Sequence, residues 1–293
     1  MTDLERIIDA RVHRPEQVAE AAARRPRRTS LTGPNGRLLI VAADHPARGA
    51  LRAGSRPLAM GNRMDLLDRL RVALSRPGVD GLLATADVIE DLLLLGALDH
   101  KVVFGSMNRG GLAGTAFEID DRFTGYDPAT IAAMGFEGGK MLFRIDPADP
   151  ATAATMQACA EAVNGLASRR LIALIEPFVT HRIEGRLRID LSPEAVIRSL
   201  AIASGLGTTS AYTWLKVPVV EDMERVAAAT TLPMLLLGGD VPADPDALYL
   251  RWQKALRLPA VRGLVVGRAL LYPPDDDVAG AVDTAVDLLA EAT

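Results

Sequence analysis

The sequence predicts an α/β protein folded as a (β/α)8 TIM barrel, and three observations support this prediction. Eight short apolar runs recur along the 293 residues. Segments with apolar residues at three- and four-residue spacing separate them, as is typical of amphipathic helices. The length also agrees, because a barrel of this class needs about 250 residues.

Each apolar run is short and almost continuously apolar, as expected of a parallel strand that is covered on both faces. The eight expected strands are 37–44, 79–85, 101–107, 138–146, 170–177, 211–218, 232–240 and 261–269.

Helical patterns fill the intervals between these runs. Ser192 followed by Pro193 is a typical helix start, because serine caps the first turn and proline suits the first helical position. The expected helices are 64–76, 91–98, 151–167, 192–204, 220–230, 244–256 and 276–292.

The segment before the first strand is rich in Arg and Ala and predicts one additional helix. We therefore expect a helical extension over residues 1–36 and a (β/α)8 barrel over residues 37–293. A doubly wound sheet is the alternative fold. The first strand, however, is followed by DHPARGALRAG and not by a glycine-rich dinucleotide fingerprint.

The longest connection covers about residues 107–126. A loop of that length in a compact domain is usually functional or disordered. We expect its Asp120–Asp121–Arg122 segment to be solvated.

Charge and composition exclude several classes of protein. The net charge of -4 gives no basic footprint for nucleic acid or for an anionic membrane. The single cysteine, Cys159, forms no internal disulfide framework and fits a reducing cytosol, so we expect a cytoplasmic protein. No apolar run approaches the roughly 20 residues of a membrane span, and the first 25 residues lack the apolar stretch of a secretory signal.

Lysine is rare in this chain. Of 33 basic residues only four are lysine, and the other 29 are arginine. Lys216 nevertheless lies within TWLKVPVV, a run typical of a buried strand, where a charge is costly. Lys140 lies in another such run. This placement indicates that the two lysines serve chemistry and not surface charge.

Barrel enzymes carry their chemistry at the carboxyl ends of the strands. Two lysines and two carboxylates from four different strands could therefore face one mouth. The polar and glycine residues at these ends are Asp44, His45, Asn108, Arg109, Lys140, Arg144, Asp146, Glu176, His181, Arg182, Lys216, Gly238, Gly239, Asp240, Gly267 and Arg268.

This set of residues suits Schiff-base chemistry. A buried amine near a second cation has a lowered pKa, and the neutral amine attacks a carbonyl carbon to form an imine. We expect Lys216 to be that nucleophile and Lys140 to assist it and bind the carbinolamine oxygen. Glu176 or Asp44 would move the protons.

Glycine amides with an arginine suit a phosphate group. Gly238, Gly239, Gly267 and Arg268 lie where barrels often hold one. A second anionic group of the substrate would suit the arginines Arg109, Arg144 or Arg182. The four histidines are scattered, which disfavours a metal-dependent enzyme, and we expect no metal or cofactor.

Each of these residues also has a purely structural interpretation. Lys216 could be an ion-pair partner, and Lys140 could face the helical layer. Asp44 could cap a turn, and Glu176 could bind loop amides. Arg268 could pair with Asp240 or with the C-terminal acids, while His45 and His181 are expected to be loop residues.

The order of these motifs resembles the class I (Schiff-base) aldolases, the group containing deoxyribose-phosphate, tagatose-bisphosphate and archaeal-type fructose-bisphosphate aldolases. The nearest similarity is to actinobacterial deoxyribose-phosphate aldolase-like proteins associated with inositol catabolism. LKVPVV matches the strand that carries the Schiff-base lysine. The other matching motifs are AADHPARGAL, GGKMLFRID, LIEP, LLGGD and VVGRA.

The resemblance implies Lys216, Lys140, Glu176 and Asp44 as catalytic residues, with phosphate contacts from the glycine-bearing ends of the last two strands. It also implies a homo-oligomer and a phosphorylated sugar as substrate. One departure is that LPMLLLGGDV lacks the second lysine of deoxyribose-phosphate aldolases, which argues against that substrate. His45-Pro46 also differs from the pattern, and His181 and Arg182 have no counterpart in it.

The sequence therefore predicts an aldolase that yields dihydroxyacetone phosphate and an aldehyde. Candidate substrates are 2-deoxy-5-keto-gluconate 6-phosphate, tagatose or fructose bisphosphate, and a sulfosugar phosphate. The alternatives are a Schiff-base dehydratase, a transaldolase-like transferase and a non-catalytic barrel that senses sugar phosphates.

Overall fold

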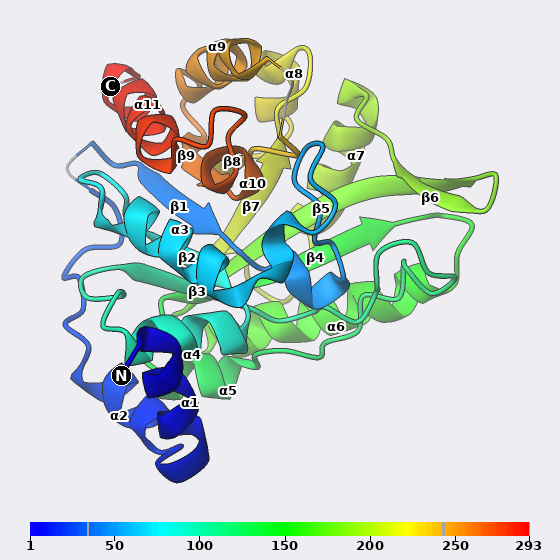
Figure 1. Cartoon of the computed structure of the whole chain (residues 1–293). Coiled ribbons are helices and arrows are strands. Elements are labelled where there is room, and N and C mark those ends of the chain that lie inside the picture. The colour runs from blue at the N-terminus through cyan, green and yellow to red at the C-terminus, as the bar shows by residue number, and fades with distance from the viewer. Residues whose placement is uncertain (34, 242–243, 293) are drawn as a thin grey trace.

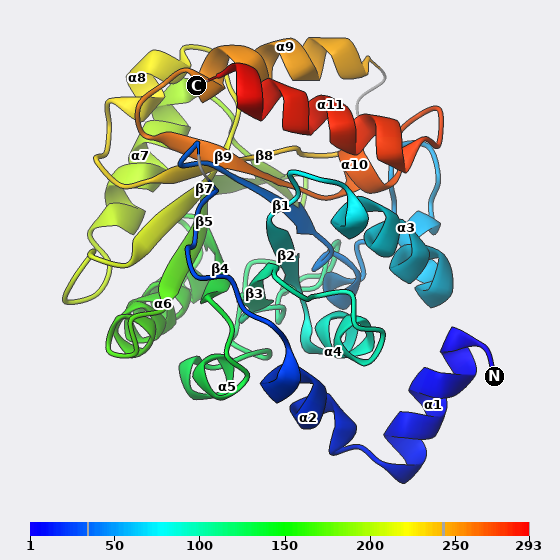
Figure 2. The ribbon, with the colours of Figure 1, turned by 90° about the vertical axis from the view of Figure 1, so that its left-hand side faces the viewer.

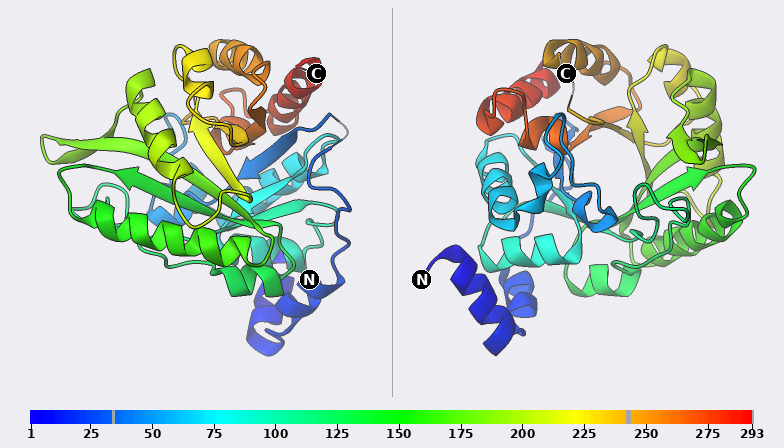
Figure 3. Two further views of the ribbon diagram at one scale, coloured as in Figure 1. Left: turned by 180° about the vertical axis from the view of Figure 1, so that it is seen from behind. Right: turned by 45° about the vertical axis from the view of Figure 1, so that its right-hand side comes forward.

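Eight parallel strands close into a barrel in the computed structural model, which describes residues 1–33, 35–241 and 244–292 (Figure 1). The barrel strands are β1 (Leu38–Ala42), β2 (Gly81–Ala84), β3 (Val102–Ser106), β4 (Gly138–Ile145), β5 (Ile172–Ile183), β7 (Thr213–Pro218), β8 (Met234–Leu237) and β9 (Val261–Val266). Their order is β4-β3-β2-β1-β9-β8-β7-β5, and pairing of β4 with β5 completes the ring. The predicted (β/α)8 fold is thus confirmed, as the ring of strands inside helices in Figure 3 shows.

Helices follow the strands and cover the outside of the barrel (Figure 2). The α-helices of this layer are α3 (Arg63–Ser75), α4 (Ala86–Leu94), α5 (Pro128–Ala133), α6 (Ala151–Ala167), α7 (Pro193–Ser204), α8 (Met223–Ala227), α9 (Pro245–Leu256), α10 (Arg268–Leu271) and α11 (Val278–Glu291). Two short 3-10 helices, η1 (Pro46–Arg48) and η2 (Ala59–Gly61), follow β1. No helix in the described residues is long and apolar enough to cross a membrane.

The expected helix starts are explained by side-chain caps. The Ser192 hydroxyl accepts a hydrogen bond from the Ala195 amide at 3.3 Å, and Pro193 occupies the first position of α7. The helix α8 is shorter than the predicted 220–230. Asp222 before it is left-handed, with φ 54° and ψ 49°, so the helical conformation begins only at Met223.

The chain before the barrel forms two helices where one was expected. They are α1 (Asp3–His13) and α2 (Gln17–Arg24), and they lie outside the ring of barrel helices (Figure 2). Pro15 lies between them, and proline removes the amide hydrogen that a continuous helix would need.

Arg25, directly after α2, ties this extension to the barrel. Its side chain is buried, and its guanidinium donates to the carbonyl oxygens of Lys101 at 2.6 Å and Gly135 at 2.9 Å. Glu137 Oε1 lies 3.6 Å from its Nη2 atom. The carbonyls and the carboxylate together satisfy a charge that would otherwise be costly to bury.

Apolar side chains fill the barrel interior toward the amino ends of the strands. This interior cluster consists of Leu38, Ile40, Ala42, Leu83, Val102, Phe104, Leu174, Leu235 and Val265, with Trp214 packed against it. A larger cluster lies between the outer faces of the strands and the helices. The interior is therefore a packed core up to the layer that carries the charged residues.

The long connection after β3 is held to the barrel by buried polar contacts. Asn108 donates to the Leu142 carbonyl at 2.6 Å and accepts from the Leu142 amide at 2.7 Å. Arg144 donates to both carboxylate oxygens of Asp121, at 2.8 and 2.6 Å. The expectation that Asp121 is solvated is wrong, because this ion pair buries its side chain completely.

We predict that Arg25→Met lowers the free energy of unfolding by about 2 kcal/mol, because buried carbonyls lose a charged donor. Urea denaturation followed by circular dichroism measures this change. Arg24→Met is the matched control, since the Arg24 side chain is 73% exposed and has only a 3.8 Å contact with Glu20. An equal loss in both variants would contradict the anchoring role of Arg25.

Candidate functional site

Three charged residues face the barrel interior just above the apolar cluster. Alternate residues of a strand point to the same face, so Lys140 lies one layer above Gly138 on β4 and Glu176 one layer above Leu174 on β5. Lys216 occupies the same layer on β7, two residues after Trp214. The two lysines are buried, with 1% and 3% exposure. The Lys140 amine is ion-paired with Glu176 inside the barrel, so the interpretation of Lys140 as facing the helical layer does not hold.

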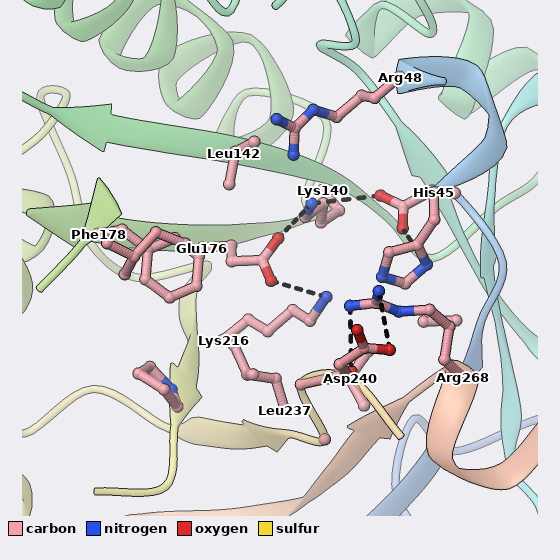
Figure 4. Close-up of a pocket in the computed structure, with 18 of the residues that line it drawn as sticks. His45, Arg48, Lys140, Leu142, Glu176, Phe178, Lys216, Leu237, Asp240 and Arg268 are labelled. Atoms are coloured by element: carbon pink, nitrogen blue, oxygen red, sulfur yellow. Dashed lines mark hydrogen bonds and ion pairs between the residues drawn. The ribbon is translucent and has the colours of Figure 1, made fainter. Parts of the chain in front are cut away.

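Glu176 joins the two lysines, as the dashed lines in Figure 4 show. Its Oε1 atom lies 2.9 Å from Lys216 Nζ, and its Oε2 atom is ion-paired with Lys140 Nζ. Lys140 Nζ also lies 3.2 Å from Asp44 Oδ2. Lys140 is therefore held between two carboxylates, whereas Lys216 contacts one.

Asp44 follows β1 and is 1% exposed. Its Oδ2 atom accepts a hydrogen bond from the Arg109 guanidinium and another from the Ser106 hydroxyl at 3.3 Å. Arg109 Nε in turn donates to the Ser106 oxygen at 2.9 Å. Asp44 is thus a buried anchor for two cations, Lys140 and Arg109.

The network shifts the pKa values of its members. Burial and the neighbouring Arg109 lower the pKa of Lys140 to about 8. Burial raises the pKa of Glu176, but Lys140 and Lys216 outweigh this effect and hold it below its usual value. Burial also raises the pKa of Asp44, but the positive charges of Arg109 and Lys140 outweigh this effect. The pKa of Asp44 is therefore well below its usual range. Both carboxylates are consequently ionised near neutral pH.

These residues form the floor of a cavity of about 500 Å³ at the carboxyl ends of the strands. Among the residues that the structure describes, seven basic side chains line it against four carboxylates. The basic residues are Arg48, Arg109, Lys140, Arg144, Lys216, Arg251 and Arg268. The cavity therefore has an excess of three positive charges in a chain of net charge -4, which favours an anionic ligand.

The predicted phosphate residues lie together at one side of this cavity. Gly238, Gly239, Gly267 and Arg268 all line it. Arg268 Nη1 lies 3.1 Å from Asp240 Oδ1, so the ion pair considered as its structural alternative is also present. A phosphate bound here would share Arg268 with this carboxylate.

The three arginines expected at a second anionic group are engaged elsewhere. Arg109 is paired with Asp44, and Arg144 with Asp121. Arg182 lies outside the cavity lining, donates to the Ala116 carbonyl at 2.9 Å and lies 3.4 Å from Asp149. Arg48 of η1 was not expected at the site, but it points into the cavity in Figure 4. Its place four residues after Asp44 was the available signal.

The two histidines near strand ends differ in their positions. His45 lines the cavity, and burial lowers its pKa to about 3, so the 3.9 Å contact with Asp44 is not an ion pair near neutral pH. His181 lies on the extended part of β5, where its side chain is half exposed. Among the described residues, no group of three or more His, Cys, Asp or Glu side chains is arranged to hold a metal ion.

The sequence and the fold of this chain are similar to those of known proteins. Residues 36–286 match the Cgl0159-like family, so the chain belongs to this family. It is similar to Cgl0159 from Corynebacterium glutamicum, at 52% identity over 99% of this chain and 98% of that one, with a TM-score of 0.96. No curated protein matches the sequence.

More distant structures share the barrel fold. A Schiff base-forming fructose-1,6-bisphosphate aldolase is 16% identical, with a TM-score of 0.67 over 93% of this chain and 99% of that one. An archaeal fructose 1,6-bisphosphate aldolase is also 16% identical, with a TM-score of 0.66 over 94% and 99%. The fold is thus that of class I fructose-bisphosphate aldolases.

We predict that Asp44→Asn lowers the free energy of unfolding by about 3 kcal/mol, because Arg109 and Lys140 lose a buried anionic partner. Asp283→Asn is the control. It removes an exposed ion pair with Arg76, so its effect on the free energy of unfolding should be much smaller. Chemical denaturation of both variants measures the difference, and a cost for Asp44→Asn no larger than the control would contradict the assigned network.

Proposed function

We propose that this protein is a class I aldolase that forms or cleaves a carbon–carbon bond of a phosphorylated keto-sugar through a Schiff base on Lys216. The observation that carries the proposal is the pair of buried lysine amines joined by one carboxylate, Glu176, at the floor of a cationic cavity. The aldolase fold of the distant structures supports it.

Lys216 is the better placed of the two amines for attack on a carbonyl carbon. It contacts Glu176 alone, while Lys140 is fixed between Glu176 and Asp44. A nucleophile must move toward the substrate, and fewer ion pairs have to break for Lys216. The lowered pKa of Lys140 makes this residue the alternative candidate for the nucleophile. Mapping the trapped adduct distinguishes the two lysines.

Glu176 is the proposed proton carrier. It lies between both amines, whereas Asp44 is fixed by Arg109, Ser106 and Lys140. When Lys216 becomes a neutral carbinolamine nitrogen, Glu176 loses one of the two cations that depress its pKa. Its carboxylate can then take up and return a proton during bond cleavage.

Lys140 would remain an ammonium and donate a hydrogen bond to the carbinolamine oxygen as water leaves. The phosphate would bind near Gly238, Gly239, Gly267 and Arg268. The product would be dihydroxyacetone phosphate and an aldehyde. The candidate substrates include 2-deoxy-5-keto-gluconate 6-phosphate and tagatose or fructose bisphosphate.

The first test is borohydride trapping with dihydroxyacetone phosphate, followed by intact mass and peptide mapping. We expect a reduced adduct on Lys216 in the native protein and none in Lys216→Met. Lys140→Met should still form the adduct, slowed by about 100-fold because the carbinolamine loses its acid. Lys254→Met replaces an exposed lysine that does not line the cavity, and this variant should behave as the native protein does.

An adduct on Lys140, or one that persists in Lys216→Met, would overturn the assignment of roles. A folded protein that gives no adduct with this ketone and with other ketone phosphates would favour the sugar-phosphate sensor. Analysis of products distinguishes an aldolase from a dehydratase or a transaldolase, which share the imine. Activity that survives a chelator excludes a metal-dependent aldolase.

The rate of adduct formation should also report the titration of Lys140. Its pKa of about 8 means that the ammonium is present below pH 8 and lost as the pH rises through this value. Above it, the carbinolamine oxygen loses its donor and the rate falls. Trapping rates from about pH 6.5 to about 9.5 should therefore show a descending limb that Lys140→Met lacks. The same limb in both proteins would assign the titration to another group.

A further inference from the structure

A β-hairpin extends one wall of the cavity above the barrel. The strand β5 runs for 12 residues and pairs with β4 up to Val179, and its last part pairs antiparallel with β6 (Arg186–Ile189). Glu184 and Gly185 form the turn, with φ values of 51° and 75°. Two successive left-handed residues are typical of a tight two-residue hairpin connection.

The hairpin presents apolar side chains to the cavity. Phe178 of β5 and Leu187 and Ile189 of β6 all line it, as does Leu191 just beyond. Leu187 is opposite Arg182 and Ile189 is opposite Thr180, so their side chains share a face with Phe178. Arg186 and Arg188 alternate with them and do not line the cavity.

The layer directly above the charged residues continues this wall. Residues two positions along a strand face the same side, so Leu142 lies above Lys140 and Phe178 lies above Glu176. Leu142 is 3% exposed and Phe178 is 8% exposed. A ligand atom that leaves the lysine layer toward the hairpin therefore meets these two carbon side chains first, and Arg144, the next residue on this face of β4, is ion-paired with Asp121.

The expected phosphate residue Arg268 lies across the cavity from the hairpin. In Figure 4, Phe178 and Arg268 are on opposite sides, with Glu176 and Lys216 between them. A carbonyl carbon held on Lys216, with its phosphate near Arg268, directs the rest of the molecule toward Phe178. Two further cations line the cavity. Arg48 has Glu118 Oε1 3.5 Å from its Nη2 atom, and Arg251 of α9 donates from its Nε atom to the Ala247 carbonyl.

Part of the apolar wall is also open to solvent. Ile189 is 47% exposed and Leu191 is 52% exposed, although both border the cavity. An apolar ligand group that covers exposed aliphatic side chains removes apolar surface from water, and this favours binding. The wall is therefore suited to a ligand that brings carbon surface of its own.

We infer that the aldehyde half of the substrate carries an apolar substituent, which binds against Leu142, Phe178, Leu187 and Ile189. This inference rests on the proposed Schiff-base function and narrows its substrate to a ketone phosphate condensed with an apolar aldehyde. It differs from a sugar bisphosphate, whose distal phosphate would need an uncompensated cation, because the cations beside this wall, Arg144 and Arg182, are ion-paired with Asp121 and Asp149.

The reaction balances without any further reactant. Glu176 removes a proton from the carbon next to the iminium carbon, giving an enamine. That carbon forms a bond to the aldehyde carbon, and Glu176 returns the proton to the resulting alkoxide. Water then hydrolyses the iminium and frees the Lys216 amine, so no oxidant or reductant is needed.

The test is condensation of dihydroxyacetone phosphate with three aldehydes: hexanal, glycolaldehyde and glyceraldehyde 3-phosphate. Consumption of dihydroxyacetone phosphate gives kcat/KM for each. We expect hexanal to be the best of the three. Trapping with dihydroxyacetone phosphate alone is measured in parallel, so that loss of the Schiff base is separated from loss of aldehyde selectivity.

The variant Ile189→Ser should lower kcat/KM for hexanal by about 10-fold and leave glycolaldehyde and the trapping rate unchanged. Ile183→Ser is the matched control on the same hairpin, since Ile183 is 57% exposed and does not line the cavity. Ile189 is itself half exposed, so its replacement leaves the barrel core intact.

A preference for glyceraldehyde 3-phosphate that disappears in Arg48→Met would overturn the inference. It would indicate that the distal end of the substrate carries an anionic group. Equal use of all three aldehydes, or equal effects of Ile189→Ser and Ile183→Ser, would also overturn it. In both cases trapping by dihydroxyacetone phosphate would persist, so the proposed aldolase function would stand. Failure of trapping itself would remove that function and the inference with it.

Discussion

The arrangement of the cavity floor depends on the Lys140 ammonium, which lies between the carboxylates of Asp44 and Glu176. Without this cation the two carboxylates would repel each other, since the charge of Asp44 already acts to raise the pKa of Glu176. Each carboxylate then holds a further cation, Arg109 on one side and Lys216 on the other. One amine thus sets the positions of four other charged groups.

A network of buried charges contributes little net stability to a barrel. Burying charges costs several kcal/mol per ion before their mutual attraction offsets it, and apolar residues of similar size often stabilise a protein more. The layer below shows that the chain has this alternative available, because Leu174 and Leu235 fill the interior there. Charged residues one layer higher are therefore better explained by chemistry than by stability.

The sequence was sufficient to predict the strands and most of the cavity floor for a physical reason. Parallel strands bring their carboxyl ends to one face, so Asp44, Glu176 and Lys216 could be placed together without coordinates. The other residues depend on contacts between distant segments. Burial of Asp121 needs Arg144 from β4, and the position of Arg48 depends on the turn after β1. Both features depend on tertiary contacts, which a local sequence pattern does not predict.

The hairpin was missed because its turn signal is weak. Glu184-Gly185 is not one of the common two-residue turn pairs, and the apolar pattern of β5 changes at Thr180 as the strand leaves the barrel. The alternation of Leu187 and Ile189 with two arginines was the available clue, since a two-residue period indicates a strand with two different faces.

The electrostatics and the shape of the cavity together limit what can bind. The chain carries a net charge of -4, so its outer surface does not attract anions in general, whereas the cavity has an excess of three positive charges. Charge focused in a cavity with low-dielectric walls selects ligands that carry negative charge at the right place. Because Arg268 lies across the cavity from Phe178 and the Arg144 beside Phe178 is ion-paired with Asp121, an anionic group is favoured at the Arg268 side and carbon at the Phe178 side (Figure 4). A ligand that is anionic at one end and apolar at the other satisfies both constraints, and a uniformly charged ligand satisfies only the first.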